Sequence, residues 1–470
     1  MPAVQKSVTP PFIRKSKYGP SVGKRAVELP EIVSLRMSDL FPDIPDTIYT
    51  EGECISSIRK ATQNALNAVN MDMIKAGDSV NILSSQYGFQ LMGGDAYAEM
   101  LRTIKDVVEQ KTGCRKIRLR VATGFRIKEP DEIIEHYQLD ACFNGEACSV
   151  TCLDKGVPID TEIGTLYGIA SIYDADWIIH AHHGELRELD MHRMINRAVK
   201  PFAMSYARLE TRGVAHINFG PRSANFIQKA IFYSPFVQQK FAFGCFLMTS
   251  PAGITGVEAS RDLETLDRKM LLFNIKPYGK VRQILSKIDD CVVILDGSGE
   301  PRYMLGGGIS FGNFTEAELD LFDLDVIPVS LGYNLYERPP GPRTPSVNPA
   351  IKALVINHMW LGVPQMELPG HIPTIVVGRE MEDIIDRDPM NTEFMNYAVT
   401  AQSLEAAVKF AKKIAGTDRI LVFDGSFGNL HLSESLAEFL IEVAPEVSRE
   451  VEQELLPKWL HQRDIELHEI

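Results

Sequence analysis

Blocks of apolar and polar positions along the chain predict strands that are each followed by a helix. The run 78–85 (DSVNILSS) predicts a buried strand, and 93–113 (GGDAYAEMLRTIKDVVEQKTG) has helical spacing and ends at Gly113, a typical C-cap. A second strand is expected at 116–124 (KIRLRVATG), and the helix after it has Pro130 and several acids in its first turn. Strands alternating with helices predict a parallel, doubly wound sheet.

The pattern continues towards the middle of the chain. The segment 149–159 (SVTCLDKGVPI) predicts an alternating strand with a turn, 165–175 (TLYGIASIYDA) a short helix, and 176–182 (DWIIHAH) another buried strand. Residues 290–308 (DCVVILDGSGEPRYMLGGG) predict a hairpin that turns at Gly297–Gly299.

A further β–α–β pattern follows near the C-terminus. It consists of a strand at 374–380 (TIVVGRE), a helix at 403–416 (SLEAAVKFAKKIAG) and a strand at 419–426 (RILVFDGS). A chain of 470 residues is too long for one core, because a domain has roughly 150 residues. The Pro-dense stretch 336–349 is the best candidate for a linker.

These patterns predict an α/β protein with two domains, each with a mostly parallel sheet flanked by helices. The expected division is an N-terminal arm over 1–30, an α/β domain over 31–325, a Pro-rich linker over 326–350 and a smaller C-terminal α/β domain over 351–470. The basic, Pro-rich arm is interpreted as poorly ordered or as a contact in a homo-oligomer. Ligands bind beyond the carboxyl ends of parallel strands, so the active site is expected in the cleft between the domains.

Composition narrows the class of protein. The chain is 45% hydrophobic and 24% charged, as in ordinary globular proteins, and its net charge of −13 argues against a nucleic-acid partner. No apolar run approaches the roughly 18 residues that span a bilayer, and the N-terminus has no apolar signal region. Seven cysteines without C-x-x-C spacing favour a reduced, cytoplasmic protein without structural zinc.

The segment 174–185 (DADWIIHAHHGE) carries the strongest chemical signal, three histidines at the end of a predicted strand. On a strand His180 and His182 share one face, and His183 points to the other. His192 follows in a stretch of helical spacing, and His216 lies in "GVAHINFG". Imidazole is a common metal ligand and general base. The alternative interpretation is a solvated loop that is rich in histidine.

Two glycine-containing loops are weaker candidates. The segment 305–312 (LGGGISFG) lacks the strand–GxGxxG–helix order of a dinucleotide site, so a loop packed against backbone is the simpler interpretation. Asp424, which follows a predicted strand, is expected either to bind a ligand or to cap a turn. The chain contains no P-loop lysine motif.

Taken together, these segments resemble the nickel-dependent lactate racemase family. "RVATGFRIKEPDEI" is similar to that family's strand and Gly-Thr-His-Arg turn, and "GVPIDTEIGTLYGIASIYDADWII" to its Gly-x-Pro segment and following strand. "VVILDGSGEPRYMLGG" is similar to its Asp-Gly-Glu hairpin. In that family a lysine carries the cofactor and a histidine sixteen residues later binds nickel, a spacing that Lys200 and His216 reproduce.

The resemblance implies a nickel-pincer nucleotide, a pyridinium dithio-acid mononucleotide that holds nickel. Lys200 would be its tether, His216 the nickel ligand, and His183 or His192 the proton-transfer base. Arg126 and Lys352 would bind the substrate. The implied reaction is racemisation or epimerisation of a 2-hydroxy acid, not necessarily lactate, and the implied partners are the substrate and the cofactor-synthesis enzymes.

The chain departs from the family pattern at several positions. Ala198 and Val199 replace two glycines before the lysine, and Phe125 replaces a catalytic histidine. An Asp-x-x-Arg pair expected near "SSQYGFQ" is missing. Since a racemase needs a base on each face of its substrate, either another histidine of the cluster takes the second role or the substrate differs.

Two other functions fit the same residues. A zinc- or iron-dependent hydrolase or lyase would use His180, His182 and His192 without any nucleotide. A non-catalytic paralogue of the racemase family would have lost the chemistry together with the motifs.

Overall fold

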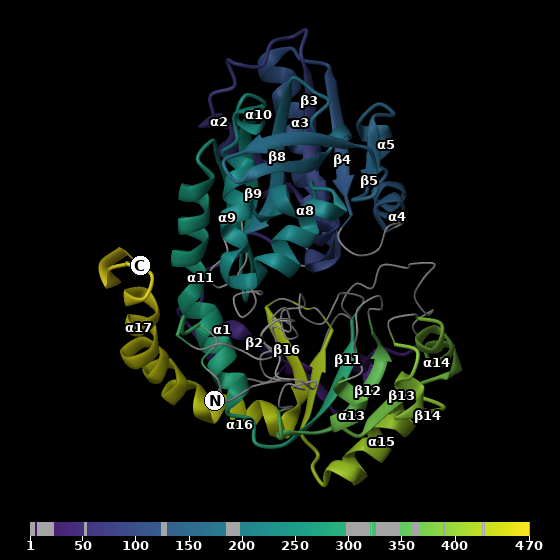
Figure 1. Ribbon diagram of the computed structural model, residues 1–470. Coiled ribbons are helices and arrows are strands. Elements are labelled where there is room, and N and C mark those ends of the chain that lie inside the picture. Colours follow the sequence, from purple (N-terminus) through teal and green to yellow (C-terminus); the bar gives the residue numbers. More distant parts are fainter. Residues whose placement is uncertain are drawn as a thin grey trace.

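Two β-sheets organise the chain in the computed structural model, and each forms the centre of one lobe (Figure 1). The structure describes residues 5–6, 23–50, 54–123, 129–184, 198–297, 320, 322–325, 348–359, 367–388, 391–424, 426 and 428–469.

The first lobe contains a six-stranded sheet with the order β10-β9-β8-β3-β4-β5. All neighbours are parallel except β9 and β10. Its strands are β3 (Ser79–Ser85), β4 (Lys116–Ala122), β5 (Ala147–Val150), β8 (Trp177–Gly184), β9 (Phe241–Ser250) and β10 (Gly253–Ser260).

Helices cover both faces of this sheet. Apolar side chains of α2 and α3 pack on one face, and those of α7 and α9 pack on the other. The helices of this lobe are α2 (Ser56–Asn67), α3 (Asp95–Thr112), α4 (Glu129–His136), α5 (Leu139–Cys142), α7 (Lys200–Ala203), α8 (Leu209–Gly213), α9 (Gly220–Phe232) and α10 (Pro235–Gln238).

The second lobe contains an eight-stranded sheet with the order β1-β2-β16-β15-β11-β12-β13-β14. The five strands from β15 to β14 are parallel, and the other three join antiparallel. The strands are β1 (Gln5–Lys6), β2 (Ile32–Arg36), β11 (Cys291–Asp296), β12 (Ile351–His358), β13 (Thr374–Val377), β14 (Val399–Ala401), β15 (Ile420–Phe423) and β16 (Asn429–Ser433).

The helix α15 (Leu404–Ala415) packs on one face of the second sheet, and α16 (Glu434–Glu450) packs on the other. The remaining helices are α1 (Met37–Leu40), α13 (Glu367–His371), α14 (Arg379–Asp386) and α17 (Leu456–His461). The long α11 (Leu263–Ser286) contacts strands of the first lobe and α16 of the second, so it joins the two lobes (Figure 1). No helix in the described ranges is long and apolar enough to cross a membrane.

The fold class expected from the sequence is confirmed, since both sheets are mostly parallel and flanked by helices. Local patterns also gave β3, α3 and α15 correctly. The C-cap Gly113 has a φ of +72°, and the side chain of Ser403 caps the start of α15 by accepting a hydrogen bond from the amide of Ala406.

The lobes do not divide where the sequence suggested. Strand β11 was expected in the N-terminal domain, but it pairs with β12 and β15 of the second sheet. Residues 24–36, expected to be partly a loose arm, also belong to the second lobe, because Ala26 is buried there and β2 pairs with β16. Most of the expected linker, residues 326–347, lies outside the described residues.

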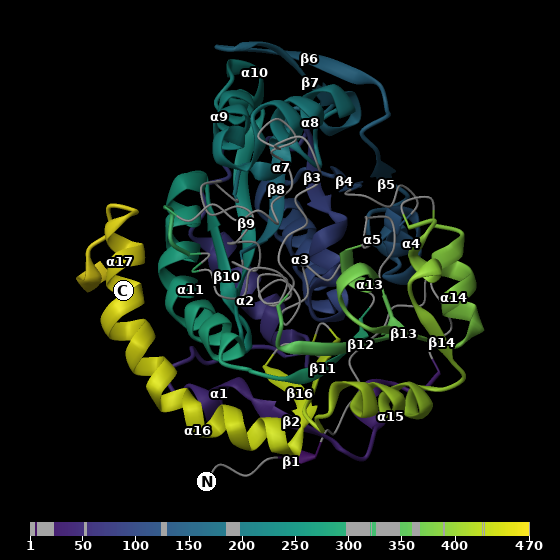
Figure 2. The same ribbon diagram turned by 60° about the horizontal axis from the view of Figure 1, so that its bottom comes forward.

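The expected helix over 165–175 is wrong. The chain there forms strand β7 (Gly164–Ile169), which pairs with β6 (Gly156–Thr161), and then a single 3₁₀ turn at Ala170–Ile172. Buried Leu166 alternates with exposed Thr165 and Tyr167, a period of two that favours a strand. Figure 2 shows this two-stranded ribbon at the outer end of the first lobe. The second strand of the expected hairpin after β11 lies outside the described residues.

Candidate functional site

The carboxyl ends of the two sheets face each other. The loop after β15 contacts the turn after β9, where the amide of Gly428 donates a hydrogen bond to the carbonyl oxygen of Pro251 at 2.9 Å. In the first sheet the chain adds β4 and β5 on one side of β3, and later adds β8 and β9 on its other side. In the second sheet it adds β12, β13 and β14 on one side of β11, and later adds β15 on its other side. These switch points lie between β3 and β8 and between β11 and β15. Ligands of doubly wound sheets bind at such points.

Strand β8 brings the histidine cluster to the first switch point. The rings of His180 and His182 stack at 5.3 Å, and those of His182 and His183 lie 4.7 Å apart. All three side chains are buried, so the solvated-loop interpretation is wrong. The pairing of β8 with β9 continues to Gly184, which makes the cluster the end of a central strand.

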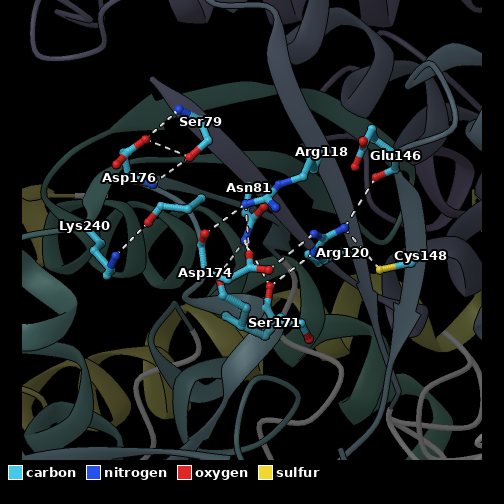
Figure 3. Close-up of polar contacts among 12 residues, drawn as sticks. Ser79, Asn81, Arg118, Arg120, Glu146, Cys148, Ser171, Asp174, Asp176 and Lys240 are labelled. Atoms are coloured by element: carbon cyan, nitrogen blue, oxygen red, sulfur yellow. Dashed lines mark hydrogen bonds and ion pairs between the residues drawn. The ribbon is translucent and has the colours of Figure 1, made fainter. Parts of the chain in front are cut away.

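Polar contacts at the other end of the sheet fix the position of β8 (Figure 3). Asp174 accepts hydrogen bonds from Asn81 Nδ2 at 2.8 Å and from Arg118 Nη2 at 2.9 Å. Asp176 accepts one from the hydroxyl of Ser79 at 2.8 Å. These contacts link the start of β8 to β3 and β4. They thereby fix the register of β8 and the position of the histidines near its carboxyl end.

His180 has a structural role. Its Nδ1 atom lies 2.9 Å from the hydroxyl of Tyr206, and its Nε2 atom lies 3.0 Å from the carbonyl oxygen of Ala198. Complete burial lowers the pKa of His180 to about 3, so the ring is neutral at physiological pH. Because both nitrogens are engaged, His180 is not available as a metal ligand.

The same contact brings the Lys200 segment to this edge of the sheet. Ala198 lies over His180, and Lys200, two residues later, is the partly buried first residue of α7. His216 belongs to a single π-helical turn, Val214–Asn218, which contacts α9, and α9 in turn contacts α7. The two segments therefore lie in one helical layer of the first lobe. The side chain of His216 is outside the described part of the chain.

Of the other residues expected at the site, His192 and Arg126 lie outside the described residues. Lys352 is exposed near the start of β12, at the amino end of the parallel strands and so away from the facing carboxyl ends. It lines a separate cavity of about 590 Å³ together with Arg282, Lys287 and Asn348.

Sequence patterns missed a set of buried polar groups beside the histidines. The hydroxyls of Ser85 and Ser205 lie 3.3 Å apart, and Gln86 Nε2 donates a hydrogen bond to the carboxylate of Glu129 at 2.9 Å. Arg212 donates to the carbonyl oxygen of Thr123 at the end of β4, and burial lowers its pKa. The available signal was the polar "SSQ", whose two serines end the buried strand β3 and whose glutamine follows it.

The second switch point also carries buried charge. Asp424 accepts hydrogen bonds from the amide of Ser426 at 2.9 Å and from Nδ1 of His431 at 2.6 Å. Burial favours a higher pKa for this carboxyl, but the charge and hydrogen bond of His431 hold the pKa of Asp424 below its usual value. Asp424 thus stabilises its turn, as one of its two sequence interpretations expected. Among the described residues no group of three or more His, Cys, Asp or Glu side chains could hold a metal ion.

Comparisons with known proteins show a distant likeness to a solved structure. No protein-family model matches the chain, and no curated protein matches it either. Among solved structures, the lactate racemase apoprotein from Thermoanaerobacterium thermosaccharolyticum is similar with a TM-score of 0.44 and 14% sequence identity. The similar region covers 83% of this chain and 95% of that chain. A likeness at this level assigns no activity to the present chain.

Proposed function

We propose that this chain is a racemase or epimerase of a 2-hydroxy acid that works with a nickel-pincer nucleotide tethered to Lys200. One observation carries the proposal. At the switch point of the first sheet, the buried imidazoles of His182 and His183 end β8 beside the segment that leads to Lys200. The segment of His216 lies in the same helical layer.

The residues present fit such a group. Ala198 and Val199 replace two glycines of the family pattern. Their side chains are buried in the apolar cluster with Phe202 and Ile231, so they do not occupy space at the carboxyl edge of the first sheet. A lysine amine can carry a covalent tether, and imidazole suits nickel. Lys200 would hold the group and His216 would bind its metal.

When bound, the cofactor would supply a hydride acceptor for the substrate carbon and return the hydride, so that the reaction has no net oxidation. The chain itself would move the hydroxyl proton. A neutral imidazole at His183 would take this proton from the substrate oxygen and later give it back. His192 remains the alternative base, and Arg126 the proposed partner of the substrate carboxylate.

A hydrolase or lyase that binds zinc or iron through His180, His182 and His192 has less support, because both ring nitrogens of His180 are engaged inside the protein. A non-catalytic paralogue predicts instead that the protein takes up no metal when it is produced together with the cofactor-synthesis enzymes.

The test is co-expression with the cofactor-synthesis enzymes, followed by intact mass measurement, metal analysis and chiral chromatography of 2-hydroxy acids. We expect added mass on the tryptic peptide that contains Lys200, bound nickel and interconversion of enantiomers. Lys200→Ala should lose the added mass and the activity but keep its free energy of unfolding within about 1 kcal/mol. Lys269→Ala, on an exposed position of α11, is the matched control. Zinc without nickel, or full activity in Lys200→Ala, would refute the proposal.

A further inference from the structure

Two buried serine hydroxyls meet at the carboxyl edge of the first sheet. Ser85 is the last residue of β3, and Ser205 lies two residues after the end of α7. Their exposed fractions are 1% and 6%, and their Oγ atoms lie 3.3 Å apart. Two hydroxyl oxygens usually approach to about 2.8 Å, so this hydrogen bond is long and weak.

Within the described part of the chain, one hydroxyl proton of this pair has no acceptor. Each serine carries one O–H donor, and only one of the two can donate in their mutual contact. The other hydrogen bond of the pair runs from the amide of Tyr87 to Oγ of Ser85 at 3.4 Å and uses no hydroxyl proton. Leaving a buried donor without an acceptor costs free energy, so the pair is suited to a bound molecule that supplies the acceptor.

The pair lies on the same face of the sheet as His180. Leu83 pairs with His180 across β3 and β8, and side chains two residues apart on a strand share a face, so Ser85 projects on the face of Leu83. The residue after Ser205 is Tyr206, whose hydroxyl contacts Nδ1 of His180. Both serines therefore lie beside the core residues that hold this ring.

Ser205 also lies close in the fold to Lys200, the proposed tether. The amide of Tyr206 donates a hydrogen bond to the carbonyl oxygen of Pro201 at 2.8 Å, so the chain after α7 folds back on the first residues of that helix. A molecule attached to Lys200 thus has the hydroxyl of Ser205 within a short distance along the same helical turn.

The backbone around the two hydroxyls is fixed by neighbouring elements. Nη2 of Arg212 donates to the carbonyl oxygen of Ser205 at 3.2 Å and to that of Thr123, directly after β4, at 3.0 Å. Ser85 pairs with Ala122 at the end of the same strand. Donors held on rigid elements lose little conformational freedom on binding, so the pair is preorganised for a ligand.

We propose that the hydroxyls of Ser85 and Ser205 bind an anionic oxygen, either of the phosphate of the tethered nucleotide or of the carboxylate of the 2-hydroxy acid. The inference rests on the proposed function, from which both molecules are taken. Both groups are oxyanions, and a hydrogen bond to a charged acceptor is roughly twice as strong as one between neutral groups. The serines position the anion and transfer no proton.

Anion binding by the protein without cofactor is the first test. Titration calorimetry with inorganic phosphate and, separately, with glycolate gives a Kd for each kind of anion. Ser205→Ala should raise the Kd of at least one of them about tenfold or more, because a hydrogen bond to a charged group contributes at least that factor. Ser85→Ala should act in the same direction on the same anion.

Ser84→Ala is the matched control. Ser84 is a completely buried serine on the opposite face of β3, and its hydroxyl donates to the carbonyl oxygen of Arg120. Ser84→Ala should lower the melting temperature and leave both Kd values unchanged. Ser205→Ala should keep the melting temperature of the wild type, because its hydroxyl makes only the weak contact with Ser85. A merely structural role of the pair predicts the reverse.

Nickel uptake and KM identify which anion is bound. After co-expression with the cofactor-synthesis enzymes, Ser205→Ala should contain less nickel than the wild type if the serines hold the nucleotide phosphate. It should contain as much nickel but show a raised KM for the 2-hydroxy acid if they hold the substrate carboxylate.

The outcomes separate this inference from the proposed function. Anion binding that depends on the serines, in a protein that never takes up nickel, would refute the proposed function and support the anion site. Racemisation with unchanged Kd, nickel content and KM in Ser85→Ala and Ser205→Ala overturns the anion site alone. A wild type that binds neither anion, with variants that match it in nickel content, also overturns the anion site.

Discussion

The Nδ1 atom of His180 lies 2.9 Å from the hydroxyl oxygen of Tyr206, and this contact fixes the ring of His180 inside the protein. Tyr206 is completely buried, and burial raises its pKa well above the usual value, so the hydroxyl keeps its proton. The ring of His180 is thus part of the apolar core between β8 and α7, whereas His182 and His183 lie at the end of the strand.

His180 should make stability depend on pH in a defined direction. Its pKa is about 3 in the folded protein and about 6.5 in an unfolded chain. Below pH 6.5 the unfolded chain therefore binds a proton that the folded protein does not. The contribution of His180 is fully present above pH 6.5, and we expect a loss of up to about 1.4 kcal/mol per pH unit as the pH falls from 6.5 towards 3.

Urea unfolding between pH 8 and pH 5 measures this dependence. His180→Gln should flatten the curve below pH 6.5, and His461→Gln, an exposed position in α17, should leave it unchanged. An identical slope in His180→Gln and wild type would contradict the assignment of His180 as a buried neutral ring.

Asp174 should stabilise the start of β8. Asp174→Ala removes one acceptor of Arg118 and one of the completely buried Asn81, whose Nδ2 also donates to two backbone carbonyl oxygens. We expect a loss of about 1 kcal/mol in the free energy of unfolding, because two hydrogen bonds to a half-exposed carboxylate are lost. Asp418→Ala serves as the control, since its side chain is 89% exposed, and should change stability by less than about 0.5 kcal/mol. Equal effects of the two substitutions in thermal unfolding would refute the role of Asp174.

Gly428 should be intolerant of any side chain. Its φ is +80°, and a Cβ atom there would lie 2.8 Å from the carbonyl oxygen of Ala252 in the other lobe. Gly428→Ala should thus combine backbone strain with a clash and cost about 2 kcal/mol or more. Gly416→Ala isolates the strain, because Gly416 has a φ of +67° with open space around it, and should cost about 1 kcal/mol. Equal losses of stability in the two variants would mean that the backbone at Ala252 moves away from the new methyl group at no cost in free energy.

Arg25 and Asp296 should depend on each other. The carboxylate of Asp296 is completely buried and accepts hydrogen bonds from Arg25 Nε at 2.9 Å and from the amide of Ala26 at 2.7 Å. Arg25→Met leaves a buried acid without this cation, so we expect a loss of about 3 kcal/mol. A double-mutant cycle with Asp296→Asn should recover part of that loss, and strictly additive effects in chemical unfolding would contradict the coupling.

Sequence patterns predicted the elements that carry their own local signals. The helix α15 has a capping serine at its start and Gly416 after its end, and β3 is a buried run of the right length. The same patterns did not predict strand pairings between residues that are distant in sequence. The pairing of β2 with β16 joins residues almost 400 positions apart, and a strand as short as β11 has no mark that tells which sheet it joins.

The candidate site was predictable to the same extent. The sequence placed three histidines at the end of a strand, and the structure has them at the carboxyl end of β8. Their separate roles depend on Tyr206 and on the backbone of Ala198, which no spacing rule connects to His180. The contact of Gln86 with Glu129 spans 43 positions and forms only once β3 and α4 have come together.

The position of β16 between β2 and β15 has a consequence for biosynthesis. The first lobe is one continuous stretch, so it can fold on the ribosome while later residues are still being added. The second sheet cannot be completed early, because β2 is synthesised near the start of the chain and its neighbour β16 ends only at Ser433. The early-translated edge of β2 therefore stays unpaired for nearly the whole of synthesis, and an open strand edge is a place where unfinished chains can aggregate.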